Sequence, residues 1–531
     1  MIATQSPHSN GKVIRIINAR LVGKQTNALF DIELADGRVQ TINPAVARDD
    51  CTTSTVEFIG QTDLDGSKVV DLRGNFLAPS LVDHHVHSAA WTHHTRRLDL
   101  SNQASAAGVL QVVAERLLGE SGSETLVGCG FRVGAWPDLE ALNLFNLDRI
   151  AANRPVALIC SDLHSMVCNT AALNFLNIPV DEYADGWLRE KPCFDATVQL
   201  GDVGDEKLDE WIAEMALQAA AKGVTEIVDF EMNHNIRNWT RRIQQKGFRT
   251  LRVRAGMYQP HINDAISRGL KTGDTIPETA GLLTVGPYKI ITDGSLGTQT
   301  AFCHAVYPGT QNRGLWIYPD ETLQSMAEYG TKNSLTLAIH AIGDQANHRT
   351  LRILDSLSPP SLSGSSIEHA QLVSENDVHL FKKLGLIASV QPEHLNDDRE
   401  LCGRYWPHST GRAFAFKSLL DAGVVLKLGS DAPVAALDPW RAIAAAVSRC
   451  RGAVDAGGEF ADGFHPEQKI GRADAWIGST SNGKAAVSVG DVADFCVLES
   501  DPLNCDLEQL RNMKVLGTML GGNWTFKLEN E

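Results

Sequence analysis

Five apolar segments in the second half of the chain each end abruptly in a polar or charged cluster. They are LLTVGPYKIITDG, SLTLAIHAIG, SSIEHAQ, LIASVQPEH and VVLKLGSDAP, all between residues 282 and 433. Parallel strands of a barrel are buried along their length and carry polar groups at their carboxyl ends, so they produce this pattern. Helix-like stretches such as LDEWIAEMALQAAAKG alternate with these strands. The pattern therefore predicts an α/β fold, a (β/α)8 TIM-like barrel.

The two ends of the chain have a different texture. Residues 13–75 contain short β-prone runs separated by turn signals such as DG and RG, and strand texture returns after about residue 485. We therefore expect a small β-sandwich-like domain built from both chain termini, with parts at 1–75 and 485–531 that flank a barrel at 76–484. The stretch 120–205 does not fit a strand–helix unit and is interpreted as an insertion that lines the site.

Composition limits the partners of the chain. The 531 residues carry a formal net charge of −16 without a long Lys/Arg run, which disfavours nucleic-acid and anionic-membrane surfaces. The ten cysteines contain no C-x-x-C pair, and the first residues, MIATQSPHSNGKVIRI, contain no apolar signal segment. We expect a cytoplasmic protein without a membrane span that acts on a small molecule. Self-association into a homo-oligomer is left open.

The segment LVDHHVH places His85 and His87 two residues apart at the end of a predicted strand. Side chains at i and i+2 of a strand share a face, so these two imidazoles could chelate one metal ion. By itself the tripeptide favours the simpler interpretation of two hydrogen-bonded histidines. His84 is expected on the opposite face and, like His93 and His94, is interpreted as a structural or rim residue.

Ligand-type residues recur at the ends of later strands, namely His340, His369 and Asp431. Together with the strand of His85 and His87 these make four, and packing alone does not explain four such strands, because buried imidazole and carboxylate groups are costly unless they are paired or bound to a metal. Lys289 lies inside an apolar strand and needs a partner or a lowered pKa. It either pairs with Asp293 or, as a neutral amine, takes up CO2 to form a carbamate ligand.

The order His-x-His, Lys, His, His, Asp resembles that of the amidohydrolase superfamily. More narrowly, the chain is similar to the YtcJ-like branch, which includes N-substituted formamide deformylase. The resemblance covers roughly residues 75–505. It rests on the segments LAPSLVDHHVH, VALICSDLHSMVCNTAAL, YKIITDGSLGTQTA, IHAIGDQA, IEHAQ, SVQPEH, GSDAPVAALDPW and VGDVADFCVLESDPL.

The resemblance implies a site of one or two divalent metal ions, with zinc as the first expectation. The implied ligands are His85 and His87 for the first ion, His340 and His369 for the second, carboxylated Lys289 between them, and Asp431. The resemblance also implies that Asp431 shuttles protons and that Asp162, His164 and His394 bind substrate.

The implied reaction is hydrolysis of a C–N bond, in an amide, N-formyl or N-acyl group, by metal-activated hydroxide. Two alternatives stay open. The same site could hydrolyse an ester, lactone or phosphoester or support a metal-dependent decarboxylation, and the chain could be a non-catalytic binding or assembly protein.

Overall fold

The architecture is taken from a computed structural model of the chain. It describes residues 13–24, 28–45, 68–119, 124–132, 136–151, 153–201, 203–357 and 359–528. The first twelve residues, for which no secretory signal is expected, lie outside the described residues.

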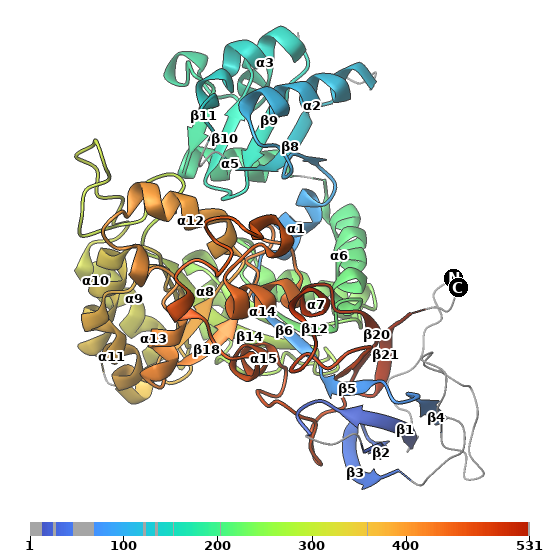
Figure 1. The fold of residues 1–531 in the computed structure, drawn as a ribbon. Helices are drawn as coiled ribbons and strands as arrows, with labels where there is room; N and C mark the ends of the chain where they lie inside the picture. The colour runs from blue at the N-terminus through green and yellow to red at the C-terminus, as the bar shows by residue number, and fades with distance from the viewer. Residues whose placement is uncertain are drawn as a thin grey trace.

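An eight-stranded, all-parallel sheet forms the centre of the molecule (Figure 1). Its order is β18-β17-β16-β15-β14-β13-β12-β6. The strands are β6 (Leu81–Val86), β12 (Val224–Asp229), β13 (Arg252–Met257), β14 (Leu283–Ile291), β15 (Leu337–Ala341), β16 (Ser366–His369), β17 (Ile387–Val390) and β18 (Val425–Leu428). A parallel bridge between Val86 and Ala432 brings the two edge strands together. The predicted α/β barrel class is confirmed.

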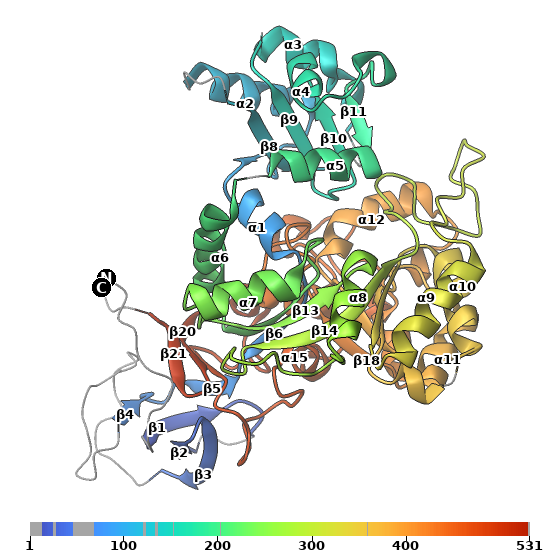
Figure 2. The same ribbon diagram turned by 180° about the vertical axis from the view of Figure 1, so that it is seen from behind.

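Helices follow the barrel strands, and most of them cover the outside of the sheet (Figures 1 and 2). They are α6 (Asp205–Ala220), α7 (Asn235–Gln245), α8 (Gln259–Ser267), α9 (Asp320–Lys332), α10 (Asp344–Asp355), α11 (Glu375–Leu384), α12 (His394–Tyr405), α13 (Phe416–Asp421), α14 (Pro439–Ser448) and α15 (Arg472–Ser479). Amphipathic spacing buries one face of each helix: in α6, Ile212, Met215, Ala216 and Ala219 enter the barrel core. None of the helices in the described ranges combines the length and apolar character that a membrane crossing requires.

Strands from both ends of the chain form a second sheet, seen at the bottom of Figure 1. They are β1 (Ile14–Leu21), β2 (Phe30–Ala35), β3 (Arg38–Pro44), β4 (Lys68–Asp71), β5 (Phe76–Pro79), β19 (Phe495–Leu498), β20 (Val515–Leu520) and β21 (Asn523–Lys527), and the short helix α16 (Leu507–Arg511) precedes β20. β5 pairs antiparallel with β19, so the chain ends share one hydrophobic core that includes Ile32, Leu77, Phe495 and Met519.

A separate lobe stands over the barrel on the side of α1 and α12 (Figure 2). Its five-stranded sheet contains β7 (Leu98–Asp99), β8 (Leu126–Phe131), β9 (Val156–Cys160), β10 (Ser165–Cys168) and β11 (Trp187–Arg189). The helices of the lobe are α2 (Ala106–Gly119), α3 (Leu144–Ala151), α4 (Thr170–Phe175) and α5 (Lys191–Leu200), whereas α1 (Ser88–His94) packs on α6 of the barrel. The sheet starts before residue 120, and the domain limits given above stay predictions.

Candidate active site

The residues predicted from the strand ends gather at the carboxyl ends of the barrel strands. His85 is in β6 and His87 follows it, Lys289 is in β14, His340 in β15 and His369 at the end of β16, and Asp431 follows β18. Neighbouring parallel strands end at the same edge of the sheet, so residues hundreds of positions apart meet there.

Three of these side chains form a compact group. Ligand atoms of His85, His369 and Asp431 all lie within 4.8 Å of one another, and all three residues are buried. Asp431 Oδ1 is 3.5 Å from Nε2 of His85 and 3.2 Å from Nε2 of His87. The ring of His340 packs against that of His369 with centroids 4.4 Å apart. The five residues therefore form one cluster.

Lys289 joins this cluster. Its Nζ atom lies 3.2 Å from Nε2 of His85 and 4.4 Å from the centre of the Phe230 ring. Asp293, the alternative partner, instead accepts hydrogen bonds from the backbone amides of Phe302, Ile342 and Gly343. Burial lowers the pKa of Lys289 to about 8, although the nearby carboxylates oppose that shift. A substantial fraction of this amine is therefore neutral at mildly alkaline pH.

Three buried imidazoles of the cluster, those of His85, His340 and His369, favour the neutral form that binds metal ions. Burial and the nearby Lys289 lower the pKa of His85 and hold that of His340 well below its ordinary value. Burial and the neighbouring His340 also hold the pKa of His369 well below its ordinary value. Nδ1 of His369 is also buried without a hydrogen-bond partner among the described residues. Neutral imidazoles beside a carboxylate are the donor set that divalent ions such as zinc accept, so the residues present fit a metal.

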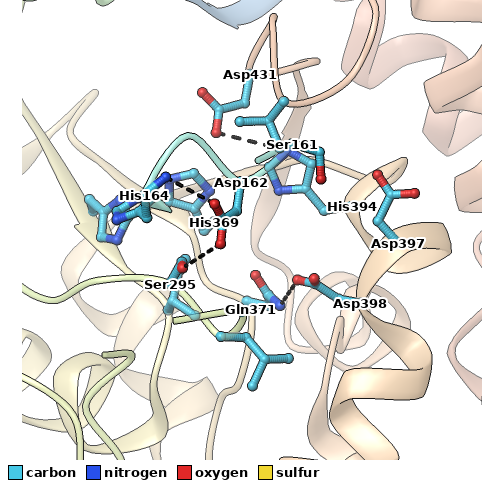
Figure 3. A pocket seen from close by; sticks show the side chains of 15 residues that line it. Ser161, Asp162, His164, Ser295, His369, Gln371, His394, Asp397, Asp398 and Asp431 are labelled. Atoms are coloured by element: carbon cyan, nitrogen blue, oxygen red, sulfur yellow. Dashed lines mark hydrogen bonds and ion pairs between the residues drawn. The ribbon is translucent and has the colours of Figure 1, made fainter. Parts of the chain in front are cut away.

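Asp431 is the carboxylate of the cluster. Burial raises the pKa of this group, but His85 and His87 outweigh burial and hold it well below its usual range. The same contact raises the pKa of His87 in spite of burial. On the other side of the carboxylate, Oδ2 of Asp431 lies 3.9 Å from Nε2 of His394, and Figure 3 shows the two groups facing each other across the cavity.

A small cavity of about 60 Å³ opens beside the cluster (Figure 3). The overlying lobe contributes Asp162 and His164 to its wall, from the turn between β9 and β10. Nδ1 of His164 contacts Glu190 at 2.9 Å, and this contact raises the pKa of His164 against the effect of burial. Asp162 accepts a hydrogen bond from Ser295 of the barrel. Asp162, His164 and His394, the three predicted substrate-binding residues, thus share one cavity with the cluster.

A larger cavity of about 440 Å³ adjoins the first, with Ser161, Asp397 and Val434 in both walls. Guanidinium groups and carboxylates line it in pairs, such as Arg132 with Asp397 at 2.7 Å. Together the two cavities connect the cluster to a polar space between the lobe and the barrel.

Two carboxylates of the site were not predicted from the sequence. Glu368 contacts Nδ1 of His85 at 2.7 Å, and Glu190 contacts His164. Glu368 did carry a signal, because a carboxylate within the buried strand of IEH needs a partner. Glu190 does not lie within an apolar strand, and no feature of the neighbouring sequence predicted that it belongs to the site.

The prediction that His84 lies on the face of its strand opposite His85 and His87 was wrong. Ile227 pairs with Asp83 but Asp229 pairs with Val86, so β6 holds one more residue than β12 over this stretch. Such a bulge interrupts the alternation of side chains. As a result His84 lines a cavity inside the barrel, on the amino-terminal side of the cluster.

Comparisons with known proteins agree with this geometry. The sequence profile described as the amidohydrolase family matches residues 68–526. Protein LONG AFTER FAR-RED 3 of Arabidopsis thaliana is 27% identical over 506 residues, which cover 88% of this chain and 84% of the relative. YtcJ of Bacillus subtilis (strain 168) is 25% identical, with 86% and 90% covered. N-substituted formamide deformylase of Arthrobacter pascens is 22% identical, with 93% and 97% covered.

The fold is also found among solved structures. That of a metal-dependent hydrolase from Pyrococcus horikoshii OT3 is similar to this chain with a TM-score of 0.72 and 23% identity, covering 94% of this chain and 99% of the other. The family profile spans most of the chain. The matches to YtcJ and to the formamide deformylase also cover most of this chain and most of each relative. The chain therefore belongs to the amidohydrolase family, in its YtcJ-like branch, and is a hydrolase of the kind that acts on carbon–nitrogen bonds.

Proposed function

We propose that this chain cleaves an amide, N-formyl or N-acyl bond of a small molecule in a metal-dependent hydrolysis. The observation that carries the proposal is the buried group of His85, His369 and Asp431, whose ligand atoms converge at the mouth of the barrel beside a cavity. Similarity to an N-substituted formamide deformylase supports the choice of bond.

The cluster offers ligands for one or two divalent ions, with zinc as the metal that best suits imidazole and carboxylate donors. The ligands we assign are His85, His87 and Asp431 for one ion, His340 and His369 for a second, and the carbamate of Lys289 between them. In carbamate formation the neutral Nζ amine attacks the carbon of CO2 and releases one proton. The lowered pKa of Lys289 favours that neutral amine. An ion bound here supplies Lewis-acid chemistry that acidifies water and polarises a carbonyl.

Asp431 is the group we assign to proton transfer. Its carboxylate is ionised at neutral pH because His85 and His87 stabilise the charge. The carboxylate accepts a proton from the attacking water and delivers it to the leaving nitrogen, which would otherwise depart as a poor anionic leaving group.

Asp162, His164 and His394 are assigned to substrate binding because they line the cavity beside Asp431. Only a small group fits beside the cluster, so the rest of the substrate extends into the adjoining cavity of about 440 Å³. None of the nine cysteines in the described part of the chain forms a disulfide, and eight of them are buried. Free thiols support the proposal of a reducing, cytoplasm-like compartment.

The first experiment combines metal analysis with a substrate panel. Protein purified without chelator is expected to contain one or two divalent ions per chain, and chelation is expected to abolish activity. Formamides, N-acyl amino acids, lactones and aryl phosphates are then compared by kcat/KM. Activity confined to lactones or phosphates, or a chain that takes up neither zinc nor manganese, would refute the proposal.

Asp431→Asn tests the assigned proton transfer. The amide cannot accept the proton, so we expect kcat on the best panel substrate to fall at least about 100-fold while metal is still bound. Asp398→Asn is the matched control: Asp398 lines the same cavity but is held by Gln371, and we expect kcat to change less than about tenfold. Near-normal kcat in Asp431→Asn would remove Asp431 from that role.

A further inference from the structure

Another cavity occupies the opposite, amino-terminal end of the barrel. Its volume is about 530 Å³, and its walls come from the barrel strands themselves. Polar and charged side chains are unusually frequent in these walls and include His84, Glu226, Arg254, Ser366, Ser389 and Lys427. Barrel interiors at this level are ordinarily packed with branched apolar side chains. A polar cavity here therefore needs an explanation.

The outer part of this cavity has an excess of positive charge. Arg254 forms an ion pair with Glu226 at 2.5 Å. Within the described part of the chain, Lys427 has neither an ion pair nor a hydrogen bond at its ammonium group. Burial and the neighbouring Arg254 lower the pKa of Lys427, because Glu226 offsets only part of the positive charge. One cation is thus left without a compensating anion.

Two residues that line this cavity also carry buried polar atoms without partners. Nε2 of His84, on a residue that is 7% exposed, and Oγ of Ser389, on a residue that is 3% exposed, have no hydrogen-bond partner among the described residues. Buried groups of this kind are nearly always satisfied in native proteins, by protein atoms or by a bound species. Their position beside Lys427 indicates which species would satisfy them.

We propose that this cavity binds a small oxyanion, a phosphate or a carboxylate. Lys427 and Arg254 supply the opposite charge, and Ser389 and His84 supply hydrogen bonds. Charge-assisted hydrogen bonds of this kind are the strong ones in proteins, and Lys and Arg are the usual partners of oxyanions.

The site is distinct from the catalytic cluster. Phe230 and Glu368 lie at the inner end of the cavity, and both contact the cluster from below, Phe230 through Lys289 and Glu368 through His85. The Glu368 carboxylate repels an anion from that end, which places the oxyanion at the outer part near Lys427. The proposal is therefore independent of the substrate of the enzyme.

Isothermal titration calorimetry on the full, metal-loaded chain tests the proposal. Inorganic phosphate, sulfate and succinate are titrated at constant ionic strength, so that phosphate-type and carboxylate-type ligands are distinguished. We expect saturable binding of at least one oxyanion, weakened at least tenfold in Lys427→Met and at least threefold in Ser389→Ala. Lys332→Met, at an exposed lysine of α9, is the matched control and should bind as the wild type does.

Three results would overturn the proposal. The first is the absence of saturable binding for all three anions. The second is wild-type affinity in both Lys427→Met and Ser389→Ala, each verified as folded by circular dichroism; Ser389→Ala decides alone if Lys427→Met does not fold. The third is loss of binding when the metal is chelated, which would assign the anion to the catalytic cluster.

Discussion

Glu368 determines how His85 presents its ring to the cluster. A carboxylate only accepts hydrogen bonds, so Nδ1 of His85 carries the proton that Glu368 accepts, and Nε2 is the ring nitrogen that faces the cluster. The hydroxyl of Ser366 in turn donates to the other oxygen of Glu368. At the scale of single residues, the site therefore depends on a carboxylate that does not line the catalytic cavity.

Glu368→Gln should weaken metal binding about tenfold, because the neutral amide holds the imidazole less firmly and makes it less basic. The metal dissociation constant, measured against a chelating dye, checks this. Ser366→Ala is the control, since it removes only the bond to the far oxygen, and we expect a change of about twofold at most. An unchanged dissociation constant in Glu368→Gln would mean that Glu368 does not position His85.

At the scale of elements, the contact between β6 and the end of β18 brings the first histidines to Asp431. Oδ1 of Asp83 accepts hydrogen bonds from the amides of Ser430 and His85, and the amide of Asp431 donates to the carbonyl of His85 at 2.7 Å. Gly429 lies in this contact, where the two backbones approach closely. The geometry of the cluster thus depends on how tightly these strands pack.

Gly429→Ala should separate the strands. The added Cβ would lie 2.6 Å from the amide nitrogen of His85 and 2.8 Å from its Cβ, which forces the backbone to move. We expect the free energy of unfolding to fall by about 1–3 kcal/mol, with weaker metal binding. Gly403→Ala in α12 meets nothing within 4 Å and should leave stability unchanged or raise it by about 0.5–1 kcal/mol. Urea unfolding measures both; equal effects would refute this account.

At the scale of the whole molecule, Asp494 joins the barrel to the sheet built from both chain ends. It accepts hydrogen bonds from Nε and Nη2 of Arg252 in β13 at 2.9 and 3.2 Å, and from the amide of Gly521 between β20 and β21. The lobe is the third part, and it reaches the cluster through Asp162 and His164. The barrel and the lobe therefore have to assemble before the site is complete, and Asp494 fastens the third part, the terminal sheet, to the barrel.

Asp494→Ala should lower the free energy of unfolding by about 2 kcal/mol, because the Arg252 guanidinium and the Gly521 amide both lose their acceptor. The control is Asp421→Ala, which removes an exposed i,i+4 pair with Lys417 and should cost at most about 0.5 kcal/mol. Denaturant unfolding compares the two. If Asp494→Ala were no more destabilising than the control, the link would contribute nothing to the assembly.

The sequence by itself determined the barrel and the edge at which its chemistry lies. Continuous apolar runs that end in His340, His369 or Asp431 could only be buried strands, and the carboxyl ends of parallel strands meet at one mouth. The sequence also indicated that Lys289 is either neutral or paired, since a lysine inside an apolar strand must lose its charge or find a partner. These inferences rest on local pattern and on the cost of burial.

Only the tertiary structure decided which partners these residues have. The bulge that turns His84 into the barrel depends on the register between β6 and β12, which are about 140 residues apart and whose pairing no local pattern encodes. Glu368 lies 283 positions from His85, and Ser295 lies 133 positions from Asp162. Side chains so distant in sequence meet because strands and lobe pack together, and packing depends on the whole chain at once.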